Sequence, residues 1–297
     1  PSANTFTIGE QIKFVAGEVG DPHDILDLGN DTVLLANYVK GTVSLMKKST
    51  GEKISDVEGD WDLPTGVTLK PEALWRTVVG DHTYIYVIHQ AGAFEDNLFI
   101  ANGTQAVFFL EQKDKTLTPV DLNPAVDKVQ GIKIQGSFPI PVKPEVQGSK
   151  LLLVSMCTRF VNPSTVNPAN VCHNAVEELD PATQTVAVLW DMDTAGFFMN
   201  GSVKSGGGSN KFLAQIEQKV GAEYARQIVK FDPALKTSET IYSYEPGSGG
   251  FYGLYYDETR QNLYIGDINT DTVGKFTIIK ADGSKVVKTL DGIPYSG

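Results

Sequence analysis

The stretch LYYDETRQNLYIGDINTDTVGKFTI, residues 254–278, decides the fold. It consists of short runs in which apolar and polar residues alternate, and polar turns separate these runs. Alternation with a period of two is typical of β-strands that bury one face. The stretch therefore predicts strand, turn, strand, turn and strand, and the rest of the chain can be searched for the same pattern.

Three features of this region recur along the chain in one fixed order. The first is the tripeptide Tyr252-Gly253-Leu254, which has counterparts at residues 23–25 (HDI), 65–67 (TGV), 130–132 (QGI) and 195–197 (AGF). The second is a strand that ends on a small and then usually a polar residue, LYIGD, with counterparts VLLAN (33–37), LFIAN (98–102), LLVSM (152–156) and KFLAQ (211–215). The third is a hairpin at 276–290, with counterparts at 43–57, 107–121, 175–190 and 228–243.

Five units of four antiparallel strands, repeated at about 50 residues or more, are the signature of β-propeller blades. A sandwich or barrel would also supply many strands, but without markers that recur in phase. We predict an all-β fold and a single β-propeller domain over residues 1–297. Six or seven blades also remain open, because the second unit contains an additional strand, TYIYVIHQ (83–90). The N-terminal stretch 5–17 predicts one more strand, which would close the ring against the last blade.

The charge of the chain limits its partners. Its 25 Lys and Arg residues stand against 36 Asp and Glu residues, which gives a net charge of −11. Such a surface repels nucleic acid and anionic membranes, so we expect neither as a partner. No apolar run approaches the length of a membrane span. We expect a monomer that binds a small molecule or a protein.

Two cysteines bracket a loop rich in Asn, Pro, Ser and Thr. A disulfide between Cys157 and Cys172 would stiffen this loop, and closing a loop of about 15 residues contributes about 3 kcal/mol in the chain-entropy description. The alternative is a pair of reduced thiols in a cytosolic protein. We favour the disulfide, and with it a secreted, periplasmic or cell-surface location. The first residues show neither a charged leader nor an apolar signal region, so we expect that any such segment has been removed.

The final unit, residues 251–290, resembles the blades of bacterial surface-layer or YVTN-type propeller proteins. The turns FDPALKT (231–237) and LDPATQT (179–185) match the strand-turn pattern of the same family. The resemblance implies a secreted or surface-anchored protein that binds a ligand or another protein without catalysis.

A second, weaker resemblance is to gluconolactonase-like and strictosidine-synthase-like propellers. The lactonases among them hold a divalent cation in the central channel with Glu, Asn and Asp. In this chain Pro22-His23-Asp24 stands where that family shows a Glu-Gly-Pro step, and this departure speaks against a lactonase metal site.

The markers also nominate site residues, because the innermost strands of a propeller line its channel. The tripeptides place five residues around one mouth of the channel: His23, Thr65, Gln130, Ala195 and Tyr252. The strand ends give another ring: Asn37, Asn102, Met156, Gln215 and Asp267. Oriented donors and acceptors of this kind can bind a polar ligand, although Asn and Asp at such positions also tie down loops. The candidate ligand-binding residues are His23, Asn37, Thr65, Asn102, Gln130, Gln215, Tyr252 and Asp267.

Two function classes follow from these residues. The first is a non-catalytic binding propeller, which is favoured because the chain has no Gly-x-Ser-x-Gly nucleophile elbow. The second is a channel-centred enzyme, such as a metal-dependent lactonase-like hydrolase, with His23 as the base. Its one divalent cation, calcium, would be held by Asn37, Asn102 and Asp267. The sequence leaves the enzyme question open and favours the binding protein with no cofactor.

Overall fold

The computed structural model describes residues 13–15, 17–63, 68–90, 93–95, 98–100, 105–114, 116–136, 139–144, 149–155, 173–192, 198–205, 211–220, 223–244, 251–257, 259–270, 273–284 and 286–294. Only the backbone is described at 93–95, 98–100, 105, 198–205, 217–220, 223–225, 251–253, 267–270, 273–275 and 290–294. These residues form strands and turns and no helix, which confirms the all-β prediction. No helix in this part of the chain could cross a membrane.

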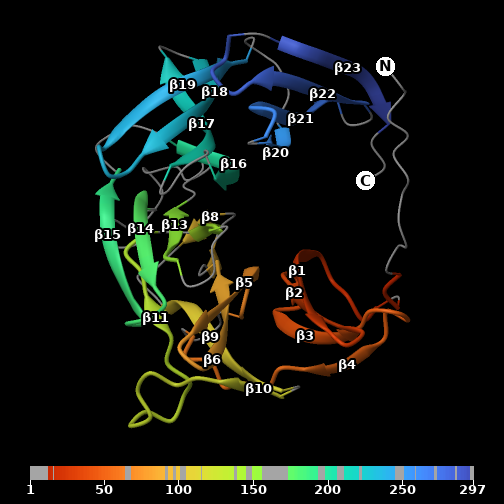
Figure 1. Cartoon of the computed structure of the whole chain (residues 1–297), viewed down its shortest axis with the longest axis vertical. Helices are drawn as coiled ribbons and strands as arrows, with labels where there is room; N and C mark the ends of the chain where they lie inside the picture. Colours follow the sequence, from red (N-terminus) through yellow and green to blue (C-terminus); the bar gives the residue numbers. More distant parts are fainter. Residues whose placement is uncertain are drawn as a thin grey trace.

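Within the described residues the strands form five successive antiparallel sheets, arranged around a common centre (Figure 1). The first sheet, blade 1, contains β1 (Pro22–Gly29), β2 (Thr32–Asn37), β3 (Thr42–Lys47) and β4 (Lys53–Asp56). Blade 2 contains β5 (Pro71–Val79), β6 (His82–His89), β9 (Gln105–Lys113) and β10 (Thr116–Pro119), with β11 (Ile132–Lys133) also paired to β9. A separate hairpin of β7 (Ala93–Glu95) and β8 (Leu98–Ile100) lies between β6 and β9 in the chain.

The remaining three sheets follow the same order. Blade 3 contains β12 (Pro139–Val142), β13 (Leu151–Ser155), β14 (Ala175–Asp180) and β15 (Thr185–Asp191). Blade 4 contains β16 (Phe198–Ser205), β17 (Phe212–Val220), β18 (Glu223–Asp232) and β19 (Thr237–Ser243). Blade 5 contains β20 (Phe251–Asp257), β21 (Asn262–Thr270), β22 (Val273–Lys280) and β23 (Val286–Pro294). The innermost strands contact one another in the order β1, β5, β12, β16 and β20.

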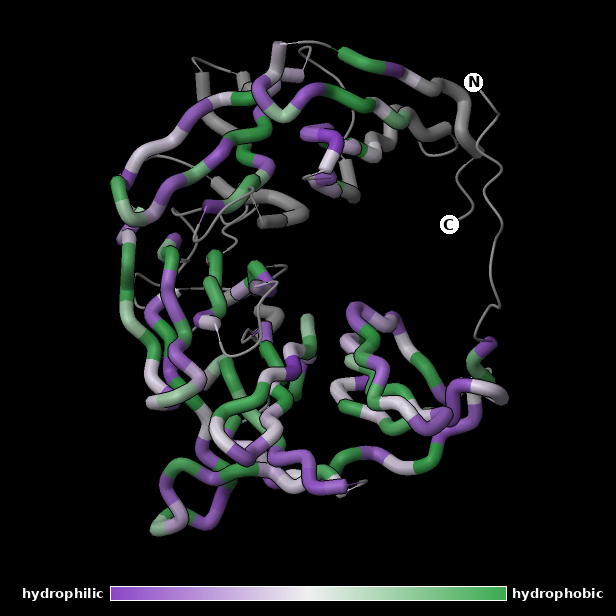
Figure 2. The backbone as a smooth tube through the Cα atoms, in the orientation of Figure 1, coloured by the Kyte–Doolittle hydropathy of each residue, from purple (hydrophilic) through white to green (hydrophobic). Residues whose placement is uncertain are grey.

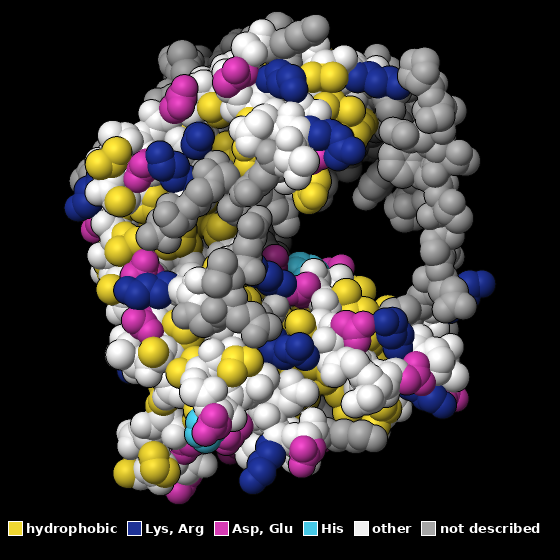
Figure 3. Space-filling model, viewed as in Figure 1, with side chains coloured by type: hydrophobic (Ala, Val, Ile, Leu, Met, Phe, Trp, Pro, Cys, Tyr) yellow, Lys and Arg dark blue, Asp and Glu magenta, His cyan; other side chains and the backbone are white. Residues whose placement is uncertain are grey.

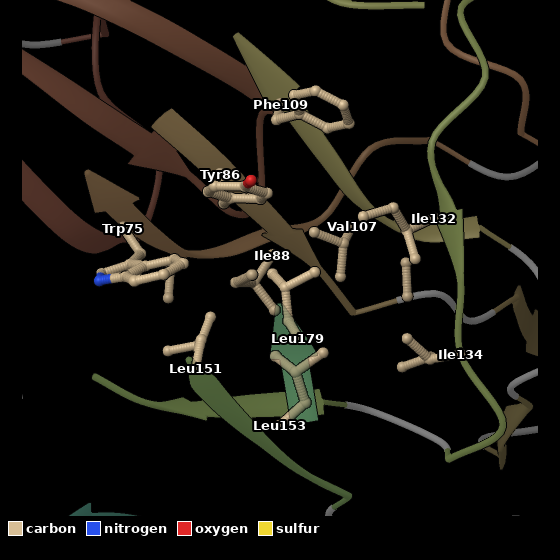
Figure 4. Packing of buried hydrophobic residues seen from close by; sticks show 12 residues of the cluster. Trp75, Tyr86, Ile88, Val107, Phe109, Ile132, Ile134, Leu151, Leu153 and Leu179 are labelled. Atoms are coloured by element: carbon tan, nitrogen blue, oxygen red, sulfur yellow. The ribbon is translucent and has the colours of Figure 1, made fainter. Parts of the chain in front are cut away.

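The hydrophobic core is divided among the interfaces between consecutive blades. Tyr86 and Ile88 of blade 2 pack against Leu151 and Leu153 of blade 3 in one of these interfaces (Figure 4). Similar clusters join blades 1 and 2, blades 3 and 4, and blades 4 and 5. Figure 2 shows hydrophobic positions along the strands of these sheets, interspersed with hydrophilic ones. Each of blades 2, 3 and 4 therefore buries both faces of its sheet against its two neighbours, and this burial stabilises a blade that could not fold alone.

The first unit also shows how the chain enters the fold. Phe14 and Val19 pack on Val33, Leu35 and Met46, which form the face of blade 1 that points away from blade 2. The segment before β1 thus covers a blade face that no neighbouring sheet covers among the described residues.

Candidate functional site

Three of the innermost strands begin with a β-bulge. In β1, Pro22 pairs with Asn37 and Asp24 pairs with Ala36, so His23 has no partner in the ladder. The same shift leaves Glu72 unpaired in β5 and Tyr252 unpaired in β20. A bulge redirects the side chain of its extra residue, and bulges are frequent next to functional sites.

The bulged residues of blades 1 and 2 meet. His23 Nδ1 lies 2.5 Å from Glu72 Oε2, and His23 Nε2 lies 3.3 Å from Asp21 Oδ2. The imidazole also stacks on the Tyr38 ring, with a centroid separation of 4.1 Å and an interplanar angle of 6°. His23 is therefore fixed on three sides, while 29% of its side chain and 20% of that of Glu72 remain exposed.

The neighbouring groups define the electrostatics of this cluster, which we call the mouth cluster: Asp21, His23, Tyr38 and Glu72. Burial raises the pKa of Glu72, and the hydrogen bond from His23 offsets this only in part. Burial, together with the charges of Glu72 and Asp21, raises the pKa of Tyr38 to about 12, so this phenol is neutral at physiological pH. The ammonium of Lys70 lies 5.4 Å from the centroid of the Tyr38 ring. Figure 3 shows His and acidic side chains at the rim of the central hollow.

Asp24, which follows the bulge of β1, links three blades. Its Oδ2 accepts a hydrogen bond from the amide of Leu74 in β5 at 2.8 Å and also accepts from Lys143 Nζ, just after β12. The equivalent positions in blades 2 and 5 hold Ala73 and Gly253, which have no such acceptor. Asp24 therefore holds the strands that carry the mouth cluster in their relative positions.

A second set of polar residues lies opposite the first residue of three inner strands, β1, β5 and β12. Asn37, His89 and Ser155 pair in register with Pro22, Pro71 and Pro139. Each is buried and has one atom without a hydrogen-bond partner among the described residues: Asn37 Oδ1, His89 Nε2 and Ser155 Oγ. Because a proline has no amide hydrogen, it cannot donate a hydrogen bond to the residue opposite it in the ladder.

His89 is neutral in this environment. Its Nδ1 accepts a hydrogen bond from the amide of Lys70 at 2.7 Å, which places the ring proton on Nε2. Burial lowers the pKa of His89 to about 4. A neutral ring locked to the backbone identifies His89 as a structural residue of blade 2.

The structure separates several of the predicted site residues. Gln130 lies beside β11 at the outer edge of blade 2, where its amide donates to Asp121 Oδ1 and its side-chain nitrogen donates to the Lys128 carbonyl. Gln215 is buried, but Ala214 and Ile216 face blade 3, so the side chain of Gln215 points to the opposite face of its sheet. The pairing of Met199 with Ile216 places Ile216, and not Gln215, at the position that corresponds to Asn37.

Other predicted residues lie at or beyond the limits of the described structure. Asp267 pairs with Phe251 and so corresponds to Asn37, but only its backbone is described, as is that of Tyr252. Thr65, Asn102, Cys157 and Cys172 lie outside the described residues, and the disulfide therefore stays a prediction. Among the described residues, no three His, Cys, Asp or Glu side chains are arranged to hold a metal ion.

Glu72 was not predicted from the sequence, although a signal for it exists. Asp-Pro-His-Asp at 21–24 and Lys-Pro-Glu-Ala at 70–73 place the bulged residue directly after a proline. The TGV tripeptide at 65–67 precedes β5 and does not mark its bulge.

Comparison with known proteins shows the fold and no family. No protein-family profile matches the chain, and no curated protein sequence matches it. Among solved structures, a protein from Lactobacillus plantarum is similar over 92% of this chain and 71% of its own, with a TM-score of 0.55 and 13% identity. A Bacteroides fragilis protein provisionally described as a 6-phosphogluconolactonase has a TM-score of 0.50 and 10% identity, over 92% of this chain and 71% of its own. A nidogen/laminin complex has a TM-score of 0.49 and 12% identity, over 91% of this chain and 80% of the matched one. The likeness is that of the β-propeller fold.

Proposed function

We propose that this protein is a non-catalytic β-propeller that binds a polar ligand at the mouth cluster. The observation that supports it is the contact between two bulged residues, His23 and Glu72, from adjacent blades. Both side chains are fixed by their neighbours and partly exposed, and prepositioned polar groups bind a ligand at a lower entropic cost than mobile ones.

The surroundings of His23 favour binding over acid–base catalysis. A general base needs a lone pair that can reach the proton of a substrate. Both ring nitrogens of His23 instead point at carboxylates, at 2.5 Å and 3.3 Å. In this arrangement the imidazole serves to orient Glu72 and Asp21, whose remaining oxygens are available to donors of a ligand.

A thermal-shift screen tests this proposal directly. The purified protein is melted in the presence of sugars, sugar acids, amino acids and polyamines, because a ligand that binds only the folded state raises the melting temperature. For each compound that stabilises the protein, we expect Glu72→Gln and His23→Gln to weaken affinity tenfold or more. The matched controls are His82→Gln and Glu111→Gln, because His82 and Glu111 form a similar pair at 2.6 Å on other strands of blade 2. Equal losses in both pairs, or none in either, would refute the assignment of the mouth cluster.

One observation favours a second candidate, a calcium-dependent lactonase-like hydrolase. Asn37 donates from Nδ2 to Ser44 Oγ at 2.7 Å, and its Oδ1 is a buried oxygen without a partner among the described residues. Amide oxygens are calcium ligands, and Asp267, which occupies the corresponding position in blade 5, would be a second ligand. The third predicted ligand, Asn102, follows β8 in the chain, and His89 occupies the corresponding position in blade 2. Elemental analysis of the dialysed protein, with melts in calcium and in a chelator, distinguishes the two: a stoichiometric metal and a chelator-sensitive melt would favour the hydrolase.

We also propose that the protein is secreted or surface-associated. The resemblance of residues 251–290 to YVTN-type blades supports this location, as does the predicted Cys157–Cys172 disulfide.

A further inference from the structure

The chain contains three Asn-x-Ser/Thr triplets whose middle residue is not proline, at residues 30–32, 102–104 and 200–202. In proteins that enter a secretory pathway, such a triplet accepts an oligosaccharide on the amide of its asparagine. A glycan is bulky and hydrophilic, so the asparagine that carries it must lie on the surface of the folded protein. The fold can therefore distinguish between the triplets.

Asn30 lies in the turn between β1 and β2. Asn30 and Asp31 have φ values of +51° and +62°, as a two-residue turn of type I′ requires. Both residues are exposed. Among the described residues the side-chain amide of Asn30 makes no hydrogen bond, so its nitrogen is accessible.

The rest of the triplet is held by hydrogen bonds that leave this amide free. Asp31 Oδ1 accepts from the backbone amide of Ser49 at 2.8 Å, and Asp31 Oδ2 accepts from Ser49 Oγ at 2.6 Å. The Asp31 carboxylate is thus directed at the turn between β3 and β4. Thr32 Oγ1 donates to the Asn30 carbonyl at 3.3 Å, which keeps the hydroxyl of the triplet beside the acceptor residue.

The position of the turn suits a glycan better than the position of Asn200. Asn200 lies in β16, the inner strand of blade 4, which contacts the inner strands β12 and β20. A glycan there would need space within the ring, so we expect none. Asn102 lies outside the described residues. At about 3.3 Å per residue, β1 places Gly29 about 20 Å from His23, so a glycan on Asn30 would leave the mouth cluster open.

We propose that Asn30 is an N-glycosylation site. The inference rests on the secreted location proposed above and is independent of what the mouth cluster binds. The glycan donor would be an oligosaccharide joined to a polyprenol through a pyrophosphate. The bond between C1 of the first sugar and the phosphate oxygen breaks, and its electron pair leaves with the polyprenyl pyrophosphate. C1 forms a new bond to Nδ2 of Asn30, which loses one proton.

Peptide mapping of the protein, purified from the organism that produces it, tests this proposal. Trypsin releases residues 14–40 as one peptide, because no Lys or Arg lies between Lys13 and Lys40. A peptide N-glycosidase hydrolyses the link between sugar and asparagine and leaves an aspartate, which is labelled when the digest is run in heavy-oxygen water. We expect the labelled aspartate at position 30 to be at least tenfold more abundant than in a digest without the glycosidase.

Two variants separate glycosylation from the role of Asn30 in the turn. Asn30→Gly keeps a residue that tolerates a positive φ, and Thr32→Val keeps a β-branched residue, but both remove the triplet. When the chain is secreted from yeast, both variants should lose the glycan of peptide 14–40 completely. Thr104→Val and Ser202→Ala are the matched controls, because they remove the other two triplets, and they should leave the glycan at position 30 in place.

Three results would overturn the proposal. The first is an unmodified Asn30 in native protein recovered from the medium or the cell surface, which would leave the proposed location standing. The second is recovery of the native protein from the cytosol alone, which would refute both the location and the glycan. The third is a glycan on peptide 14–40 that survives Thr32→Val, because the triplet would then not be its acceptor.

Discussion

Asp24 offers the sharpest test of how the mouth cluster is held in place. Replacing Asp24 with Ala removes the acceptor of the Leu74 amide, and the Leu74 side chain is 1% exposed. A hydrogen bond to a charged group contributes about 1.5–3 kcal/mol, and a buried donor left without a partner costs a similar amount. The ion pair with Lys143 adds little, because 42% of the Lys143 side chain is exposed and surface ion pairs contribute about 0–1 kcal/mol.

We therefore expect Asp24→Ala to lower the free energy of unfolding by about 2–3 kcal/mol and Lys143→Ala to lower it by less than about 1 kcal/mol. Asp24→Asn keeps a neutral acceptor and should recover about half of the loss. Urea denaturation at pH 7, followed by circular dichroism, measures all three variants. The reasoning is refuted if Asp24→Ala and Lys143→Ala cost the same, because the backbone hydrogen bond would then contribute nothing.

Three further predictions concern other parts of the chain. The pKa of His89 is about 4 in the folded state and about 6.5 in the unfolded chain. As the pH falls, the unfolded chain therefore gains a proton first, and the free energy of unfolding should drop by about 3 kcal/mol between pH 6.5 and 4. His89→Gln keeps an acceptor for the Lys70 amide and should flatten this part of the pH profile; an unchanged slope in urea melts would contradict the assignment. Gly51 has a φ of +71°, and a Cβ there would lie 1.8 Å from the carbonyl oxygen of Lys13. Gly51→Ala should therefore lower the free energy of unfolding by about 1–3 kcal/mol and expose the segment around Phe14 to proteolysis. Gly29→Ala is the control, because a Cβ at Gly29 meets open space, and it should leave that segment protected. A thiol titration of the native protein should find no reactive cysteine, whereas two reactive thiols would remove the argument for a Cys157–Cys172 disulfide.

The hairpins could be predicted from the sequence because their signal is local. Each combines alternating strands with a short polar turn, and the structure contains such hairpins at β3–β4, β9–β10, β14–β15, β18–β19 and β22–β23. The choice of the second strand in blade 2 was wrong, because LFIAN contributes only β8 while HTYIYVIH forms β6. Both runs are short and apolar, and only pairing with β5 and β9 distinguishes them.

The candidate site was harder to predict for a geometric reason. A shift of one residue along a strand moves a side chain to the other face of the sheet, which is why Gln215 and Asn37 do not correspond although both follow an alanine. The contact between His23 and Glu72 joins residues 49 positions apart and depends on two bulges. Neither the register of the strands nor the bulges could be predicted from apolar and polar patterning alone.

The central claim is that the mouth cluster binds a ligand and performs no chemistry on it. The most direct measurement pairs the thermal-shift screen with an assay of δ-gluconolactone hydrolysis in calcium and in a chelator, on the wild-type protein and on Glu72→Gln. The account predicts a ligand that raises the melting temperature of the wild type and not of Glu72→Gln, with no lactone hydrolysis above the buffer rate in either. Calcium-dependent hydrolysis by the wild type that is lost in Asn37→Ala and Asp267→Asn would contradict it and would assign the chain to the enzymes.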